Sequence, residues 1–208
     1  LATLFFVSIL SYTMLNIKIG ISDFNVLPDH SENQKFFDMY KENFNKEGLV
    51  PIKVIIKTDT GKITSAQNIK KVYDYIHKLK GFDAIEEVNS IVSIDNRLKL
   101  QQYQYMYSNK DNVDKNIKIL LDRTTREKFT VASVISKYGP NSLKTKELIE
   151  KIENTKPGPG LTISLAGIPV TNVDVVSTIM HSLPYAAVWI ICLTYIILLI
   201  LLRSLFLP

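Results

Sequence analysis

The chain has 208 residues, which is enough for one well-developed hydrophobic core or two small ones. Its formal net charge is +5 at pH 7, and the lysines alternate with acidic residues. A nucleic-acid surface normally shows a basic stripe with interleaved aromatic residues, so the charge pattern argues against nucleic acid as a partner. Every charge except that of Arg203 lies between Lys18 and Asp174. The chain is therefore a charged middle segment between two apolar ends.

The first apolar end, "LATLFFVSILSYTML" (Leu1–Leu15), is shorter than the roughly 20 residues that a membrane-spanning helix needs. It fits the end of a truncated transmembrane helix, the core of a signal peptide, or a buried helix. A signal peptide has a positive start and a small-residue cleavage site, and neither is visible. We therefore expect residues 1–16 to be the end of a transmembrane helix.

The charged middle, residues 17–174, begins with a helical pattern over Asp29–Lys46, whose apolar side is aromatic. The β-branched run "VPIKVIIKTD" (Val50–Asp59) closes on a turn and predicts a strand. A second strand is expected within "FDAIEEVNSIVSI" (Phe82–Ile94). A helix is expected between these two strands.

This helix is expected over Ser65–Lys80, because its apolar residues recur at helical spacing. The stripe consists of Ile69, Val72, Tyr73, Ile76 and Leu79. Thr64 and Gln67 have the spacing of an N-terminal capping box, and Gly81 is placed to end the helix.

A polar, tyrosine-rich insertion follows, over about Asp95–Arg126. The stretch "LKLQQYQYMYSNK" is compatible with a helix or a loop, and "NVDKNIKILLD" predicts a short helix. Tyr103, Tyr105 and Tyr107 alternate as residues on one face of a strand do. They could line a path for an amphiphilic substrate, but we favour an ordinary role in covering the sheet.

After the insertion, "KFTVASVISKYG" (Lys128–Gly139) alternates as a strand, and a helix capped by Asn141 or Ser142 runs to about Asn154. "LTISLAG" (Leu161–Gly167) is the last expected strand. The order β-α-β, insertion, β-α-β predicts an α+β fold of the ferredoxin-like, split βαβ type, with two helices on one face of an antiparallel sheet. The open face would be covered by the insertion, another subunit or another part of the chain.

The second apolar end has no Asp, Glu, Lys or Arg from Val175 to Leu202, and its densest part matches the length of a membrane span. We expect a transmembrane helix over residues 175–203, with Asp174 capping its start. Pro184 would lie in the first turn of the run of span length, about Leu183–Leu202, where its missing N–H costs little. Arg203 abuts the span and favours a cytoplasmic end, so residues 204–208 begin a cytoplasmic link and residues 17–174 are extracytoplasmic.

Catalytic and cofactor signatures are not recognisable. His30 and His77 have no evident nucleophile partner, "KPGPG" is not followed by the lysine and helix of a phosphate loop, and no His or Cys spacing suits a metal. We therefore predict neither an enzyme nor a cofactor. His181 is the one candidate for a proton relay in the second apolar end, and a hydrated histidine at the membrane edge is the simpler interpretation.

Four short motifs resemble the mycobacterial-membrane-protein-large (MMPL) branch of the resistance–nodulation–division superfamily. They are "VLPDHSENQKFFDMYKENF", "GIPVTNVD", "SLPYAAVWI" and "LLRSLFLP", in the order and spacing of that family, with Leu202 where its closing motif usually has Phe. The family-motif positions are Gly167, Asp174, Pro184, Arg203, Ser204 and Pro208.

The resemblance implies a fragment, more similar to the second half, of a proton-driven exporter of lipids or other hydrophobic or amphiphilic molecules. Residues 17–174 would be its extracytoplasmic, substrate-handling porter domain in a multi-pass protein of the plasma or inner membrane. The implied partners are membrane lipid, the substrate, the remaining transmembrane helices and the other porter half, and a homo-oligomer is compatible. The proton-carrying acids would lie in other helices. The alternatives are the external ligand-binding domain of a two-span receptor and a docking scaffold.

Overall fold

The computed structural model of the chain describes residues 31, 32, 35, 36, 39, 50–95, 97–108 and 114–202. The chain divides into two compact units, Asp23–Val173, and Leu1–Ser22 together with Asp174–Pro208. The first apolar end lies outside the described residues. Of the helix expected over Asp29–Lys46 only isolated positions are described, four of them helical.

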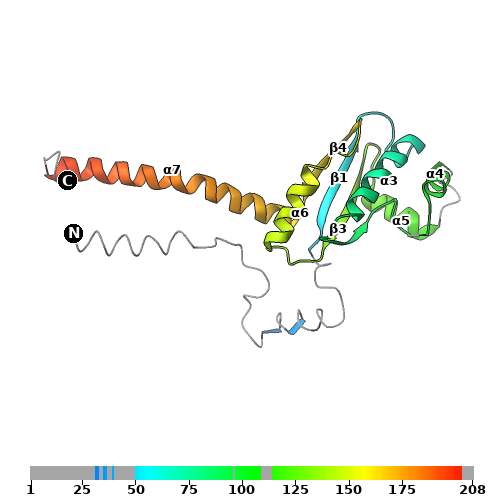
Figure 1. Ribbon diagram of the computed structural model, residues 1–208, viewed down its shortest axis with the longest axis horizontal. Coiled ribbons are helices and arrows are strands. Elements are labelled where there is room, and N and C mark those ends of the chain that lie inside the picture. Colours follow the sequence, from blue (N-terminus) through cyan, green and yellow to red (C-terminus); the bar gives the residue numbers. More distant parts are fainter. Residues whose placement is uncertain are drawn as a thin grey trace. The chain divides into compact units, whose positions relative to one another are not determined.

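A four-stranded antiparallel sheet forms the centre of the first unit (Figure 1). Its strands are β1 (Ile52–Thr58), β2 (Ile85–Asn89), β3 (Phe129–Ser136) and β4 (Leu161–Ala166), in the spatial order β2-β3-β1-β4. β1 is a central strand, with Ile55 opposite Val131 of β3 on one side and Ser164 of β4 on the other. The expected split βαβ fold is confirmed.

Two helices, α3 (Ala66–Lys80) and α6 (Leu143–Glu153), supply the apolar side chains that pack against one face of the sheet. Alternate residues of β1 point to that face and are buried, as a half-covered strand requires. The core is formed by Ile52, Val54 and Ile56 of β1, Ile69, Val72, Ile76 and Leu79 of α3, Ala132 and Val134 of β3, and Leu148, Ile149 and Ile152 of α6.

The helix caps follow local hydrogen bonding. Ser65, and not the expected pair Thr64 and Gln67, caps α3, because the Ser65 hydroxyl accepts from the backbone N–H of Asn68 at 3.4 Å while Thr64 is buried. Gly81 ends this helix as expected. Of the two candidates for the second helix, Ser142 is the cap, and its hydroxyl accepts from Thr145 N–H at 3.1 Å.

The insertion contains two helices, α4 (Leu100–Ser108) and α5 (Lys115–Thr124), and α4 packs on α3. β2 is shorter than expected, because the chain turns back after Asn89. The hydroxyl of Ser93 donates to the carbonyl of Val88 at 2.7 Å and accepts from the N–H of Ser90 at 2.8 Å. These bonds satisfy backbone groups that a longer strand would have paired with a neighbour.

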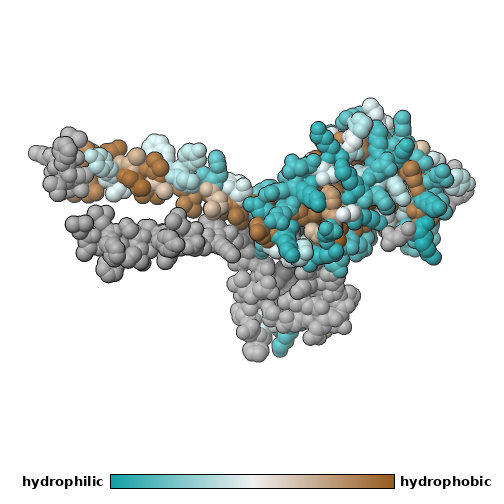
Figure 2. All heavy atoms as spheres, viewed as in Figure 1, coloured by the Kyte–Doolittle hydropathy of each residue, from teal (hydrophilic) through white to brown (hydrophobic). Residues whose placement is uncertain are grey.

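The chain continues from β4 into α7 (Ile168–Leu202), a single helix of 35 residues (Figure 1). Residues Ile168–Leu201 form the one candidate membrane span in the described part of the chain, and Figure 2 shows hydrophobic residues along much of it. The helix begins seven residues before the expected residue 175. At 1.5 Å per residue α7 is about 52 Å long, against about 30 Å for the hydrocarbon core of a bilayer.

Candidate functional site

The junction between sheet and membrane helix is a single residue, Gly167. Its φ of +110° lies in a region that side chains rarely adopt, and a Cβ there would lie 2.8 Å from the carbonyl oxygen of Pro51. Gly167 therefore provides a tight exit from the last strand. The following turn is fixed to the domain, because Val170 is buried in the core and the Asn172 amide donates to the Asn141 side-chain oxygen at 2.7 Å.

Two other family-motif residues lie differently from the sequence expectation. Asp174 does not cap α7, since the helix begins at Ile168 and Asp174 lies in its second turn. Pro184 lies in the interior of the continuous helix and not in a first turn. In a helix interior, proline removes a backbone hydrogen bond. The longer helix accounts for both differences. Arg203, Ser204 and Pro208 lie outside the described residues.

The three tyrosines of the insertion lie on α4, so their alternation is not that of a strand. Tyr103 and Tyr107 are buried on one helix face, and their rings stack with centroids 6.4 Å apart. The Tyr103 hydroxyl donates to the carbonyl of Asp95 at 2.9 Å, and that of Tyr107 to the carbonyl of Ile91. These two tyrosines brace the loop that follows β2. Tyr105 is 72% exposed.

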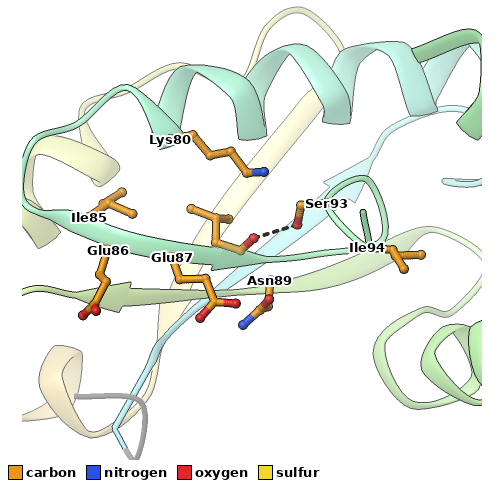
Figure 3. Close-up of a pocket in the computed structure, with 8 residues that line it drawn as sticks. Lys80, Ile85, Glu86, Glu87, Asn89, Ser93 and Ile94 are labelled. Carbon is orange, nitrogen blue, oxygen red and sulfur yellow. Dashed lines mark hydrogen bonds between the residues drawn. The ribbon is translucent and has the colours of Figure 1, made fainter. Parts of the chain in front are cut away.

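A cleft of about 370 Å³ lies along the edge strand β2 (Figure 3). Figure 3 shows Lys80 of α3 on one side of this strand, and Glu86, Glu87 and Asn89 on the other. The hydrogen bond between the Ser93 hydroxyl and the Val88 carbonyl joins two residues that line the cleft, and Figure 3 shows it as a dashed line. The charged groups do not converge on one point, so the cleft offers dispersed polar contacts and no arrangement for acid–base chemistry.

A second hollow, of about 270 Å³, lies between α3 and the loop after β2, and Lys80 lines both. Its other lining residues are Tyr73, Ile76, His77, Val92, Asp95 and Leu98. The rings of Tyr73 and His77 are nearly parallel, with centroids 5.9 Å apart. The exposed Arg97 guanidinium bonds the Asp95 carboxylate at 2.8 Å and lowers the pKa of Asp95 to about 2. An aromatic wall beside apolar and charged groups suits non-covalent binding of an amphiphilic molecule.

Sequence reasoning did not single out Lys80 or Ser93 as residues of this region. The pair Ser90 and Ser93 in "SIVSI" was a usable signal, because serine hydroxyls bond nearby backbone groups and end strands. The spacing of Tyr103 and Tyr107 by four residues was a second signal, typical of one helix face. In the described part of the chain, no group of three or more His, Cys, Asp or Glu residues could hold a metal ion.

The fold and the junction define a class of protein, a membrane-anchored α+β domain whose sheet continues directly into an apolar helix. The profile of the MMPL family matches residues 25–208, and the chain belongs to this family. It is also similar to the "Membrane protein YdfJ" of Bacillus subtilis (strain 168), with 20% identity over 201 residues. That match covers 96% of this chain and 23% of YdfJ, so the chain spans less than a quarter of the relative's length.

Proposed function

We propose that this chain is the extracytoplasmic, substrate-handling domain, with flanking membrane helices, of a proton-driven exporter of lipids or other hydrophobic or amphiphilic molecules. Membership of the MMPL family and the candidate span support a transport-related membrane protein. The observation that carries the proposal is the one-residue junction at Gly167, which joins a split βαβ sheet to α7.

The junction suits mechanical coupling. The first two turns of α7 are held by Val170 in the domain core and by the Asn172–Asn141 hydrogen bond, so a displacement of these turns would displace β4 and the loop before α6 with them. The proposed mechanism is steric, because a movement of membrane helices changes the shape of the domain that handles the substrate. The energy would come from proton-carrying acids in other helices, since Val175–Leu202 contains no acidic residue.

In this proposal the protein is a multi-pass protein of the plasma or inner membrane, with residues 17–174 on the extracytoplasmic side. Arg203 next to the span supports that orientation through the positive-inside rule. The exposed Tyr105 and the hollow beside Tyr73 and His77 are the described surfaces that suit contact with an amphiphile. The other porter half and the remaining helices would complete the path.

The test reconstitutes the full-length protein in vesicles of phosphatidylethanolamine and phosphatidylglycerol that contain a fluorescent phospholipid. Albumin on the extracytoplasmic side of the protein accepts exported lipid, and transfer is measured with and without an imposed proton gradient. We expect gradient-dependent transfer. A four-residue Gly-Ser insertion after Gly167 should abolish the transfer, whereas the same insertion between α4 and α5 should preserve it.

The outcomes separate the parts of the proposal. Transfer that ignores the proton gradient contradicts a proton-driven exporter. Gradient-dependent transfer that survives the insertion after Gly167 contradicts mechanical coupling through the junction but leaves export in place. No transfer, together with tight binding of the fluorescent lipid, would favour the two-span receptor.

A further inference from the structure

Four aromatic rings, which we call the aromatic row, lead from the core of the domain to its surface. The row begins on α4, where the rings of Tyr107 and Tyr103 stack with centroids 6.4 Å apart. Tyr103 lies against Tyr73 of α3, with centroids 6.2 Å apart and a tilt of 48°. Tyr73 stacks on His77, one helical turn later, at 5.9 Å and 7° between the rings. Tyr103 and Tyr107 are buried, Tyr73 is half-buried and His77 is exposed, so the row ends at solvent.

The exposed end of the aromatic row forms a wall of the hollow of about 270 Å³ between α3 and the loop after β2. Ile76 and Val92 line the same hollow, and both belong to the hydrophobic core. The hollow therefore has an apolar floor. Because its volume lies just below the roughly 300–1,000 Å³ of ordinary ligand pockets, a long acyl chain would leave most of its length outside. A small planar ring can lie flat against the aromatic wall.

The charge that faces this hollow is positive. Lys80 lines it, and among the described residues that do so Asp95 carries the only negative charge. The Arg97 guanidinium lies 2.8 Å from the Asp95 carboxylate and offsets that charge. Glu86 and Glu87 line the neighbouring cleft, and Figure 3 shows them on the other side of β2 from Lys80. A ligand in the hollow that carries one negative group would therefore be attracted to Lys80.

We propose that this hollow is a binding site for a planar aromatic anion, whose ring continues the aromatic row and whose negative group pairs with Lys80. Aromatic rings favour offset or edge-to-face pairs with centroids about 4.5–7 Å apart, and every pair in the row lies within that range. One charged side chain at the edge of an apolar site fixes the orientation of the ligand. The proposal narrows the general contact with an amphiphile made above, but the binding itself does not depend on transport.

The test is isothermal titration calorimetry on the full-length protein in phosphatidylcholine nanodiscs, with the heat of empty nanodiscs subtracted. The probe is 2-naphthoate, and we expect saturable binding at one site. Two compounds separate the ring from the charge, since 2-naphthylmethanol keeps the ring and octanoate keeps the charge. Each should bind at least about threefold more weakly than 2-naphthoate. If either binds as tightly as 2-naphthoate, or if 2-naphthoate does not saturate, the proposal is overturned.

Matched variants of α3 place the site. His77→Ala should weaken 2-naphthoate binding about two- to tenfold, whereas His77→Phe, which keeps a ring, should preserve it. Lys80→Gln should weaken binding about two- to fivefold. Lys78→Gln is the control, because Lys78 is an exposed residue of the same last helical turn that does not line the hollow.

Unchanged binding in His77→Ala or in Lys80→Gln would overturn the assignment, and so would an equal loss in Lys78→Gln. The result is independent of the lipid-transfer experiment. Saturable binding without lipid transfer would leave this site in place and contradict the exporter, whereas lipid transfer without 2-naphthoate binding would do the reverse.

Discussion

Replacing Gly167 with alanine should lower the free energy of unfolding of the domain. Two separate effects contribute, the backbone conformation and a steric contact. The φ of +110° costs a side chain of order 1–3 kcal/mol. The new Cβ would in addition lie 2.8 Å from the Pro51 carbonyl oxygen, a backbone atom that cannot turn aside. We expect a total destabilisation of about 3 kcal/mol, an appreciable part of the 5–15 kcal/mol typical of a domain.

Two other glycines provide matched controls. Gly158 has a φ of +98°, and no atom lies within 4 Å of the point that an alanine Cβ would occupy, so Gly158→Ala should show the conformational cost alone, about 1–2 kcal/mol. Gly139 has neither a positive φ nor a neighbour within 4 Å, so Gly139→Ala should change stability by less than about 0.5 kcal/mol.

The assay is hydrogen–deuterium exchange of the full-length protein in detergent, followed in peptides from β1 and β4. A loss of about 3 kcal/mol corresponds to roughly a hundredfold faster opening of these strands in Gly167→Ala. If Gly167→Ala exchanges no faster than Gly158→Ala, the contact with Pro51 does not constrain the junction. Movement of α7 would then not be transmitted to the sheet through Gly167.

Three further predictions concern side chains of the domain. The buried hydroxyl of Tyr75 has no hydrogen-bond partner among the described residues, so Tyr75→Phe should leave the free energy of unfolding unchanged or raise it by about 1 kcal/mol. Tyr107→Phe removes a buried hydrogen bond and should lower the free energy of unfolding by about 1–2 kcal/mol; both are measured by denaturant unfolding in detergent. Ser93→Ala should lower it by about 1–3 kcal/mol and speed amide exchange in β2; unchanged exchange would contradict the role of that hydroxyl. Because the pairing lowers the pKa of Asp95 to about 2, its stabilisation is present above pH 4 and lost as pH falls toward 2. Arg97→Gln should return this pKa toward 3.8, and carboxylate NMR titration would show no change if the pairing were absent in solution.

The fold could be predicted because local sequence patterns mark its strands and helices, and the apolar residues of these patterns form the hydrophobic core. Alternating β-branched residues in β1 and the helical stripe of α3 both end in the same hydrophobic cluster. Tyr73 shows the limit of such patterns. It was expected on the buried face of its helix but is only partly buried, while Tyr75 is buried instead. Helical periodicity predicts the buried face of a helix to within about one residue, and tertiary packing determines which side chains at its edge are buried.

The boundaries of elements were harder to predict, because non-local contacts set them. β2 ends earlier than expected because the Ser93 hydroxyl donates a hydrogen bond to the Val88 carbonyl. α7 begins earlier than expected because Val170 is buried in the hydrophobic core. Composition marked only the point where charge disappears, at Val175, and not the point where the helix starts. The cleft beside β2 and the hollow beside Tyr73 depend on how α3 and the loop lie together, which the order of residues does not indicate.

The early start of α7 has a practical consequence for anyone who wishes to produce the water-soluble part alone. A fragment truncated after the last strand, at residue 166 or 167, would lose Val170, which is 5% exposed, and the amide that bonds Asn141. Such a fragment exposes apolar surface and should aggregate. Extending the fragment to Val173, the end of the compact unit, retains these contacts and ends before the long uncharged run.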